Sequence, residues 1–124
     1  MNTTPDPVDH GAHIPTVLVV EDNLSDLDIL SDYLQKIGLK ILVVQDGESA
    51  LEKAQQEQPD LILMEDVLPG IDGFETCRRL KATEEVRNIP VIFIVALGDP
   101  LVRAKVFHAG GVDYIARPFQ YEEV

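Results

Sequence analysis

The chain has 124 residues, of which 45% are hydrophobic and 26% are charged, and its formal net charge is −12. This length suits a single domain, and so acidic a chain repels phosphate backbones, so we expect no direct binding of nucleic acid. No apolar run approaches the roughly 18 residues of a membrane span and the first residues do not resemble a signal peptide, so we expect a cytoplasmic protein without a membrane segment.

The predicted elements begin after a proline-containing start. Residues 1–15 contain three prolines, and we interpret them as a flexible leader ahead of one domain at 16–124. Short apolar runs follow at 17–20, 41–44, 61–64 and 91–94, with a weaker fifth at 112–115. Because these runs are continuous rather than alternating, they predict strands covered on both faces, as in a parallel sheet.

Helical patterns fill the gaps between these strands. Apolar residues recur at three- and four-residue steps from 24 to 37, before Gly38, and further helices are predicted around 50–54, over 74–80 and over 101–109. The alternation predicts an α/β fold: an open five-stranded parallel sheet with right-handed crossovers and helices on both faces. No closing helix follows the fifth strand, so we expect a truncated last helix, with homodimerisation as another way to cover that face. The single cysteine, Cys77, is expected to be a buried hydrophobe.

Charged residues gather where the predicted strands end. Glu21-Asp22 follows the first strand, Glu65-Asp66 follows the third, and Arg117 follows the fifth. The carboxyl ends of the strands form the ligand site in open α/β sheets, so we expect these side chains to share one edge. Their oxygen ligands suit magnesium or calcium. We expect a protein that is not an enzyme. The residues also allow two alternatives, a metal-binding protein or a magnesium-dependent phosphoryl-transfer enzyme, either of which would use this edge of the sheet, the rim, directly.

Several stretches together resemble the receiver domain of response regulators in two-component signalling. They are Val-Val-Glu-Asp-Asn at 19–23, Pro-Asp-Leu-Ile-Leu at 59–63 with Pro-Gly-Ile-Asp-Gly-Phe at 69–74, Ile-Pro-Val-Ile at 89–92, and residues 110–119. The resemblance covers about 15–124. It implies a doubly wound (βα)5 fold whose function in the phosphorelay is to accept a phosphoryl group from a sensor histidine kinase, with magnesium, on an aspartate.

Carried over position by position, the family pattern is only partly matched. Glu21 and Asp22 match the acidic pair that holds the metal, and Tyr114 matches the aromatic switch. The phosphoacceptor position falls on Glu65, since Asp66 is one residue out of place and could reach the site only through a bulge or register shift.

Two further positions also depart from the pattern. The threonine or serine position falls on Val95, and the lysine position falls on Arg117. Pro118 matches a proline that commonly follows a cis peptide bond.

These departures predict a degenerate pseudo-receiver. Val95 lacks the hydroxyl that follows the phosphoryl group, and Arg117 favours bidentate pairing with a carboxylate. We expect Glu65 to pair with Arg117 and lock the site in one state, with magnesium binding weakened. Such a chain would act as a phosphorylation-independent interaction module that docks a kinase or output domain around the fourth helix and fifth strand. The alternatives are phosphorylation of Asp66, an engineered acceptor substitution that imitates phosphorylation, or an inactive site.

Overall fold

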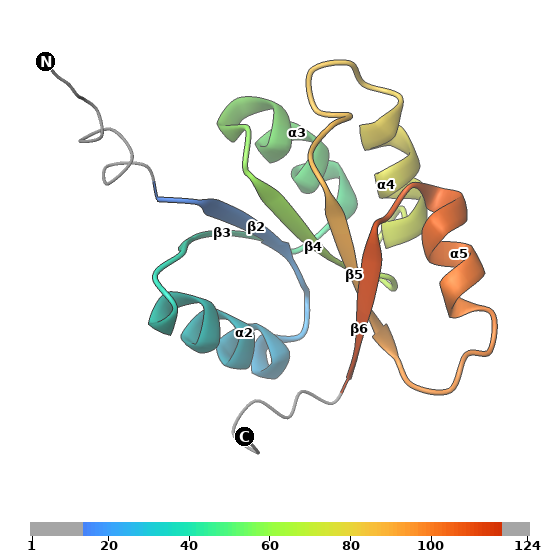
Figure 1. Ribbon diagram of the computed structural model, residues 1–124, viewed down its shortest axis with the longest axis horizontal. Helices are drawn as coiled ribbons and strands as arrows, with labels where there is room; N and C mark the ends of the chain where they lie inside the picture. The colour runs from blue at the N-terminus through green and yellow to red at the C-terminus, as the bar shows by residue number, and fades with distance from the viewer. Residues whose placement is uncertain (1–13, 118–124) are drawn as a thin grey trace, which may run out of the picture.

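The computed structural model describes residues 14–117, which form a parallel five-stranded sheet with three helices on one face and a single helix on the other (Figure 1). In chain order, the elements are β2 (Thr16–Val20), α2 (Leu24–Lys36), β3 (Lys40–Val44), α3 (Gly47–Glu57), β4 (Leu61–Glu65), α4 (Gly73–Lys81), β5 (Val91–Ala96), α5 (Val102–Ala109) and β6 (Asp113–Arg117). The strand order is β3-β2-β4-β5-β6, with every pairing parallel. The predicted doubly wound α/β fold is confirmed.

The two faces of the sheet carry separate apolar clusters. On one face, α3, α4 and α5 pack on the sheet around Phe93, Met64 and Leu80, all of them buried. On the other face, α2 packs through Leu30 and Leu34. Each strand therefore contacts apolar neighbours on both sides, which explains why the strands appear in the sequence as unbroken apolar runs.

The clearest differences from the prediction concern the last strand and the two ends of α2. The fifth strand was expected at 112–115 but runs over Asp113–Arg117, so Val112 lies before it and is 52% exposed. Leu24 and Ile37 were counted in the apolar stripe of α2, yet they are 65% and 56% exposed. Leu24 is the first residue of α2 and Ile37 is its C-cap, so only the middle of the helix lies on the sheet.

Three helices start at the carboxyl edge of the sheet with the same kind of cap. The side chains of Asn23, Asp46 and Asp72 accept hydrogen bonds from backbone N–H groups three residues later, at 2.7–2.9 Å. Such caps satisfy N–H groups that a helix start leaves unpaired. They fix the first turns of α2, α3 and α4 close to the strand ends.

Some expectations fall on residues outside the described range. Most of the leader at 1–15, the peptide bond before Pro118 and the question of a closing helix are among them. Within residues 14–117, no helix is long and apolar enough to cross a membrane.

Candidate functional site

The site lies at the carboxyl edge of the three central strands and β6. Glu65 is the last residue of β4 and pairs with Ile94 of β5, while Arg117 is the last residue of β6 and pairs with Ala96. Glu21 directly follows β2, and its backbone N–H donates to Val44 O at 3.1 Å. The topology thus brings together residues far apart in the sequence, as the strand-end pattern predicted.

Three carboxyl groups converge at this edge. One oxygen each from Glu21, Asp22 and Glu65 lies within 4.8 Å of the other two. Glu21 is fully buried and Glu65 is 7% exposed, whereas Asp22 is exposed. Backbone N–H groups hold two of them in place: Asn23 N donates to Glu21 Oε2 at 3.2 Å, and Asp22 N donates to Glu65 Oε1 at 3.3 Å.

The chemistry of this triad fits a hard divalent cation. All donors are carboxylate oxygens, the ligands that Mg²⁺ and Ca²⁺ prefer. Glu21 Oε1 is buried and accepts no hydrogen bond from any described residue. A buried carboxylate oxygen without a partner is costly, and a bound cation would satisfy it. Glu21, Asp22 and Glu65 are therefore the residues that would hold the ion.

Glu65 carries the strongest electrostatic perturbation of the described residues. Burial raises its pKa to about 9, and hydrogen bonding to Glu21 and Asp22, together with the negative charge of Glu21, acts in the same direction. The surroundings of Glu65 therefore favour the protonated form of its carboxyl group. The protonated form avoids placing a further negative charge beside a fully buried carboxylate.

Arg117 lies among three acidic side chains, two at the end of β4 and one from α2. Its Nη1 is 3.7 Å from Glu65 Oε2, its Nη2 is 3.7 Å from Asp66 Oδ1, and its Nε is 3.8 Å from Asp26 Oδ2. All three distances exceed those of hydrogen bonds. Nη1 is buried and has no hydrogen-bond partner among residues 14–117. Arg117 is thus a shared positive charge rather than one arm of a tight bidentate pair.

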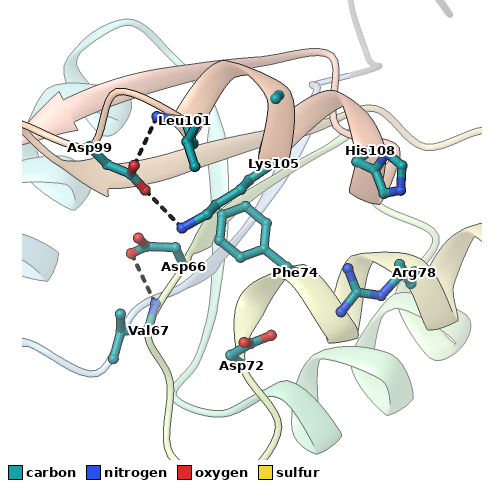
Figure 2. Close-up of a pocket in the computed structure, with 10 residues that line it drawn as sticks. Asp66, Val67, Asp72, Phe74, Arg78, Asp99, Leu101, Lys105 and His108 are labelled. Atoms are coloured by element: carbon teal, nitrogen blue, oxygen red, sulfur yellow. Dashed lines mark hydrogen bonds and ion pairs between the residues drawn. The ribbon is translucent and has the colours of Figure 1, made fainter.

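Asp66 stands beside the triad without joining it. Its backbone N–H still donates to Ile94 O at 3.1 Å, so the ladder of β4 and β5 continues one residue past the strand. Its Oδ1 accepts from Val67 N at 2.9 Å. The side chain points toward α5, beside a groove between α4 and α5 (Figure 2). No register shift brings it to the position of Glu65.

The other two positions of the pattern lie deeper in the fold. Val95 is 1% exposed and packs in the core on the side of α3, α4 and α5. Tyr114 is partly buried against the same core, and Arg103 Cζ of α5 lies 5.9 Å from the centre of its ring. The apolar Val95 side chain offers no hydrogen bond between the site and Tyr114.

The sequence pattern did not single out Asp26. It lies in the first turn of α2, where its backbone N–H donates to the capping Asn23 side chain. Its position three residues after the Asn23 cap is the signal that could have placed it near the rim. His108 was expected at the surface and is exposed there, beside the groove.

Comparisons with known proteins agree on one family. The sequence model of the response regulator receiver domain matches residues 17–124. The DNA-binding dual master transcriptional regulator RpaA of Synechocystis is 35% identical over 90% of this chain, which covers 46% of that protein. The chain thus spans about half the length of the curated relatives it matches.

Solved structures extend the likeness to the fold. A putative response regulator from Chloroflexus aurantiacus superposes with a TM-score of 0.85 at 31% identity, over 90% of this chain and 91% of that one. The receiver domain of the sensor histidine kinase PA1611 from Pseudomonas aeruginosa gives 0.80 at 32% identity, with 90% and 91% covered. That structure has a magnesium ion coordinated in its active-site cleft.

Proposed function

The chain belongs to the response regulator receiver domain family of two-component signalling, and we propose that it is a degenerate member acting as an interaction module without phosphorylation. The observation that carries this proposal is the place of Glu65. Its carboxyl group ends β4 inside the acidic triad, 7% exposed, where the resemblance puts an aspartate that is phosphorylated.

The longer side chain changes what the site can do. Glutamate has one methylene more than aspartate, and here its carboxyl group fills the space between Glu21 and Arg117. An incoming phosphoryl group would have to occupy the same space. We propose that Glu65 and Arg117 hold the site in one arrangement, partly by filling it and partly by attraction between the guanidinium and the partial negative charge on Glu65 Oε2.

The loss of the hydroxyl supports the same interpretation. In the family pattern, a threonine or serine at position 95 contacts the phosphoryl group, and Val95 has nearly the same shape without a donor. A phosphoryl group at the rim would therefore have no hydrogen-bond path to Tyr114. Packing at this position is kept while signal transmission is lost.

Magnesium remains compatible with this proposal. Glu21 and Asp22 would provide the acidic pair, and the cation would supply charge compensation for the buried oxygens. Because the positive charge of Arg117 already lies 3.7 Å from Glu65 Oε2, we propose that magnesium binds more weakly than in a phosphorylatable receiver. Catalytic turnover is not part of the proposed function.

Partner docking is proposed on the face formed by α5 and β6. Phe107 and Val112 are 51% and 52% exposed there, and Arg103 covers the ring of Tyr114. Exposed apolar side chains of this size are typical of interaction surfaces. The proposed partner is a sensor histidine kinase or an output domain, which agrees with the regulatory proteins among the relatives.

Treatment with acetyl phosphate and Mg²⁺, followed by intact mass measurement and peptide mapping, tests the proposal. We expect no adduct, while a phosphorylatable receiver treated in parallel gains about 80 Da. The main competing function is phosphorylation of Asp66, which its 3.7 Å distance from Arg117 favours. An adduct mapped to Asp66 or Glu65 would overturn the proposal, and turnover of a phosphorylated small molecule with Mg²⁺ would favour an enzyme.

A further inference from the structure

A groove lies between α4 and α5, on the side of α5 away from β6 (Figure 2). Its volume is about 680 Å³. Phe74 stands at its centre in Figure 2, and Leu101 borders it from the start of α5. The ring of Phe74 forms the apolar floor of the groove. It packs on the core residue Phe93, with ring centres 4.8 Å apart, and this contact holds the ring in place.

The groove is too open to be a small-molecule pocket. Leu101 is 61% exposed and Val67 is 68% exposed, although both border the same cavity. Pockets for small molecules bury most of the ligand surface, commonly about 70–90%. A shallow groove with exposed apolar borders suits a segment of another protein, because the rest of that protein can shield the bound segment from water.

Charge divides the groove into an acidic end and a basic end. Asp66 and Asp72 lie at the end next to the strand edge, and Arg78 lies at the other (Figure 2). No basic side chain of residues 14–117 lies within ion-pairing distance of Asp72, and Asp66 has only Arg117 at 3.7 Å. By contrast, Asp99 at the same cavity is already matched by Lys105 Nζ at 3.0 Å.

The basic end carries a surplus of positive charge. Glu75 Oε1 accepts from Arg78 Nε at 3.1 Å and Glu75 Oε2 accepts from Arg79 Nε at 2.9 Å. One carboxylate therefore pairs with two guanidinium groups, which leaves one positive charge in excess. The groove thus presents negative charge at one end, an aromatic floor in the middle and positive charge at the other end. An occupant with the reverse order of charges would be favoured in one orientation.

We propose that this groove docks a segment of a partner protein that sets an apolar side chain on Phe74 and Leu101 and a lysine or arginine beside Asp66 and Asp72. The net charge of −12 attracts such a basic segment from a distance and opposes a second copy of this chain as the occupant. This inference rests on the proposed function as an interaction module, and it adds a surface separate from the α5–β6 face.

Asp66 connects the groove to the rim. Its Oδ1 lies 3.7 Å from Arg117 Nη2, and Arg117 also faces Glu65. A cation of the partner beside Asp66 competes with Arg117 for the same carboxylate. Docking in the groove and the arrangement of Glu65 with Arg117 are therefore coupled through one side chain.

Selection from a phage-displayed library of random peptides tests this inference. The chain is the target, the support without protein serves for counter-selection, and the best peptide is then synthesised and titrated. We expect enriched peptides to combine an apolar residue with a neighbouring lysine or arginine. Backbone amide shifts on titration should cluster at α4, α5 and the segment around Asp66.

Matched variants separate the groove from general effects of substitution. We expect Leu101→Ser to weaken peptide binding about tenfold or more and Asp72→Asn to weaken it about three- to tenfold. Asparagine still caps α4, so the second variant removes charge alone. Ile37→Ser removes an exposed apolar side chain at the C-cap of α2 and Asp28→Asn removes an exposed charge on α2, and both should leave binding unchanged.

Several outcomes would overturn the groove as a docking site. These are enrichment of acidic peptides, equal binding to wild type and Leu101→Ser, shifts confined to the α5–β6 face, or recovery of no binder at all. None of them affects the acetyl phosphate experiment. Failure of the groove and failure of the phosphorylation-independent function are thus distinguishable.

Discussion

Arg117 Nη1 lies 3.7 Å from Glu65 Oε2, across the carboxyl ends of two strands that are separated by β5. Both side chains are largely buried, at 19% and 9% exposure, yet Nη1 forms no hydrogen bond with any described residue. The pair is held together by the fold rather than by its own geometry. Changes at either residue should therefore keep the fold and alter reactivity at the rim, and removal of the Arg117 charge should also lower stability.

Restoring the family pattern should restore phosphorylation. We expect the triple variant Glu65→Asp, Val95→Thr, Arg117→Lys to gain a phosphoryl adduct from acetyl phosphate with Mg²⁺, because the shorter acceptor vacates space and the lysine and hydroxyl can reach the phosphoryl oxygens. The measurement is intact mass with peptide mapping to position 65. Wild type is the unlabelled control. A triple variant that stays unlabelled would show that the degeneracy lies elsewhere.

Removal of the shared positive charge should destabilise the domain. Arg117→Met leaves the carboxylates of Asp66 and Asp26 without a cation among the described residues, and we expect the free energy of unfolding to fall by about 1–3 kcal/mol. Arg117→Lys keeps the positive charge and should therefore retain most of the stability.

Lys36→Met provides the control, because Lys36 and Asp32 form a shorter contact of 3.1 Å but are 73% and 67% exposed. Exposed pairs contribute about 0–1 kcal/mol. Equal losses in urea unfolding would contradict a structural role for Arg117.

Magnesium should stabilise the domain through the triad. At ten times the dissociation constant, a ligand that binds only the folded state adds about 1.4 kcal/mol. We expect Mg²⁺ to raise the unfolding temperature relative to EDTA, with half-saturation in the millimolar range, and Glu21→Gln to abolish the rise. Asp28→Asn removes an exposed acid outside the triad and should respond as wild type does. An undiminished response in Glu21→Gln would place the ion elsewhere.

The fold could be predicted because its strands carry a local signal. The run at 61–64 is apolar on both faces, since each of its side chains contacts one of two buried clusters. The bounds of the last strand were wrong because Val112 is apolar yet lies before the strand, whereas Arg117 is polar yet ends it. In this case, pairing with β5 decides the boundary, and sequence patterns do not contain that information.

The site could be predicted only in part. The strand-end positions of Glu21, Asp22 and Glu65 follow from topology alone. The contact of Asp26 with Arg117 and the groove beside Asp66 depend on how α2, α4 and α5 pack, and therefore on distances between side chains of different elements. No spacing in the sequence encodes those distances.

The thiol of Cys77 should be inert in the folded state. Burial raises its pKa to about 11, and the nearby Lys81 and Arg78 only partly offset this. The neutral thiol contributes stability that is fully present below the ordinary pKa near 9 and is lost as pH rises through about 11. We expect slow alkylation by iodoacetamide at pH 8 and fast alkylation in urea. Similar rates in both conditions would show that α4 opens readily.

Gly73 should be far less tolerant of a side chain than Gly38. A Cβ at Gly73 would overlap the carbonyl oxygen of Glu65, so the loop after β4 must move. Gly73 N also donates to Asp66 O at 2.8 Å, and a shift would disturb the segment that carries the acceptor position. We expect Gly73→Ala to lower the free energy of unfolding by more than about 2 kcal/mol.

The matched variant separates steric overlap from backbone strain. Gly38 has φ +91°, and no atom lies within 4 Å of the position that a Cβ would take there. Gly38→Ala therefore meets only the strain of a left-handed conformation, about 1 kcal/mol. Urea unfolding of both variants gives the comparison. Mg²⁺ titration adds a second readout, because only Gly73→Ala moves Glu65 relative to Glu21 and should weaken the response. If both alanine variants lost stability equally and bound Mg²⁺ alike, close packing of Gly73 on Glu65 would not be what positions the rim.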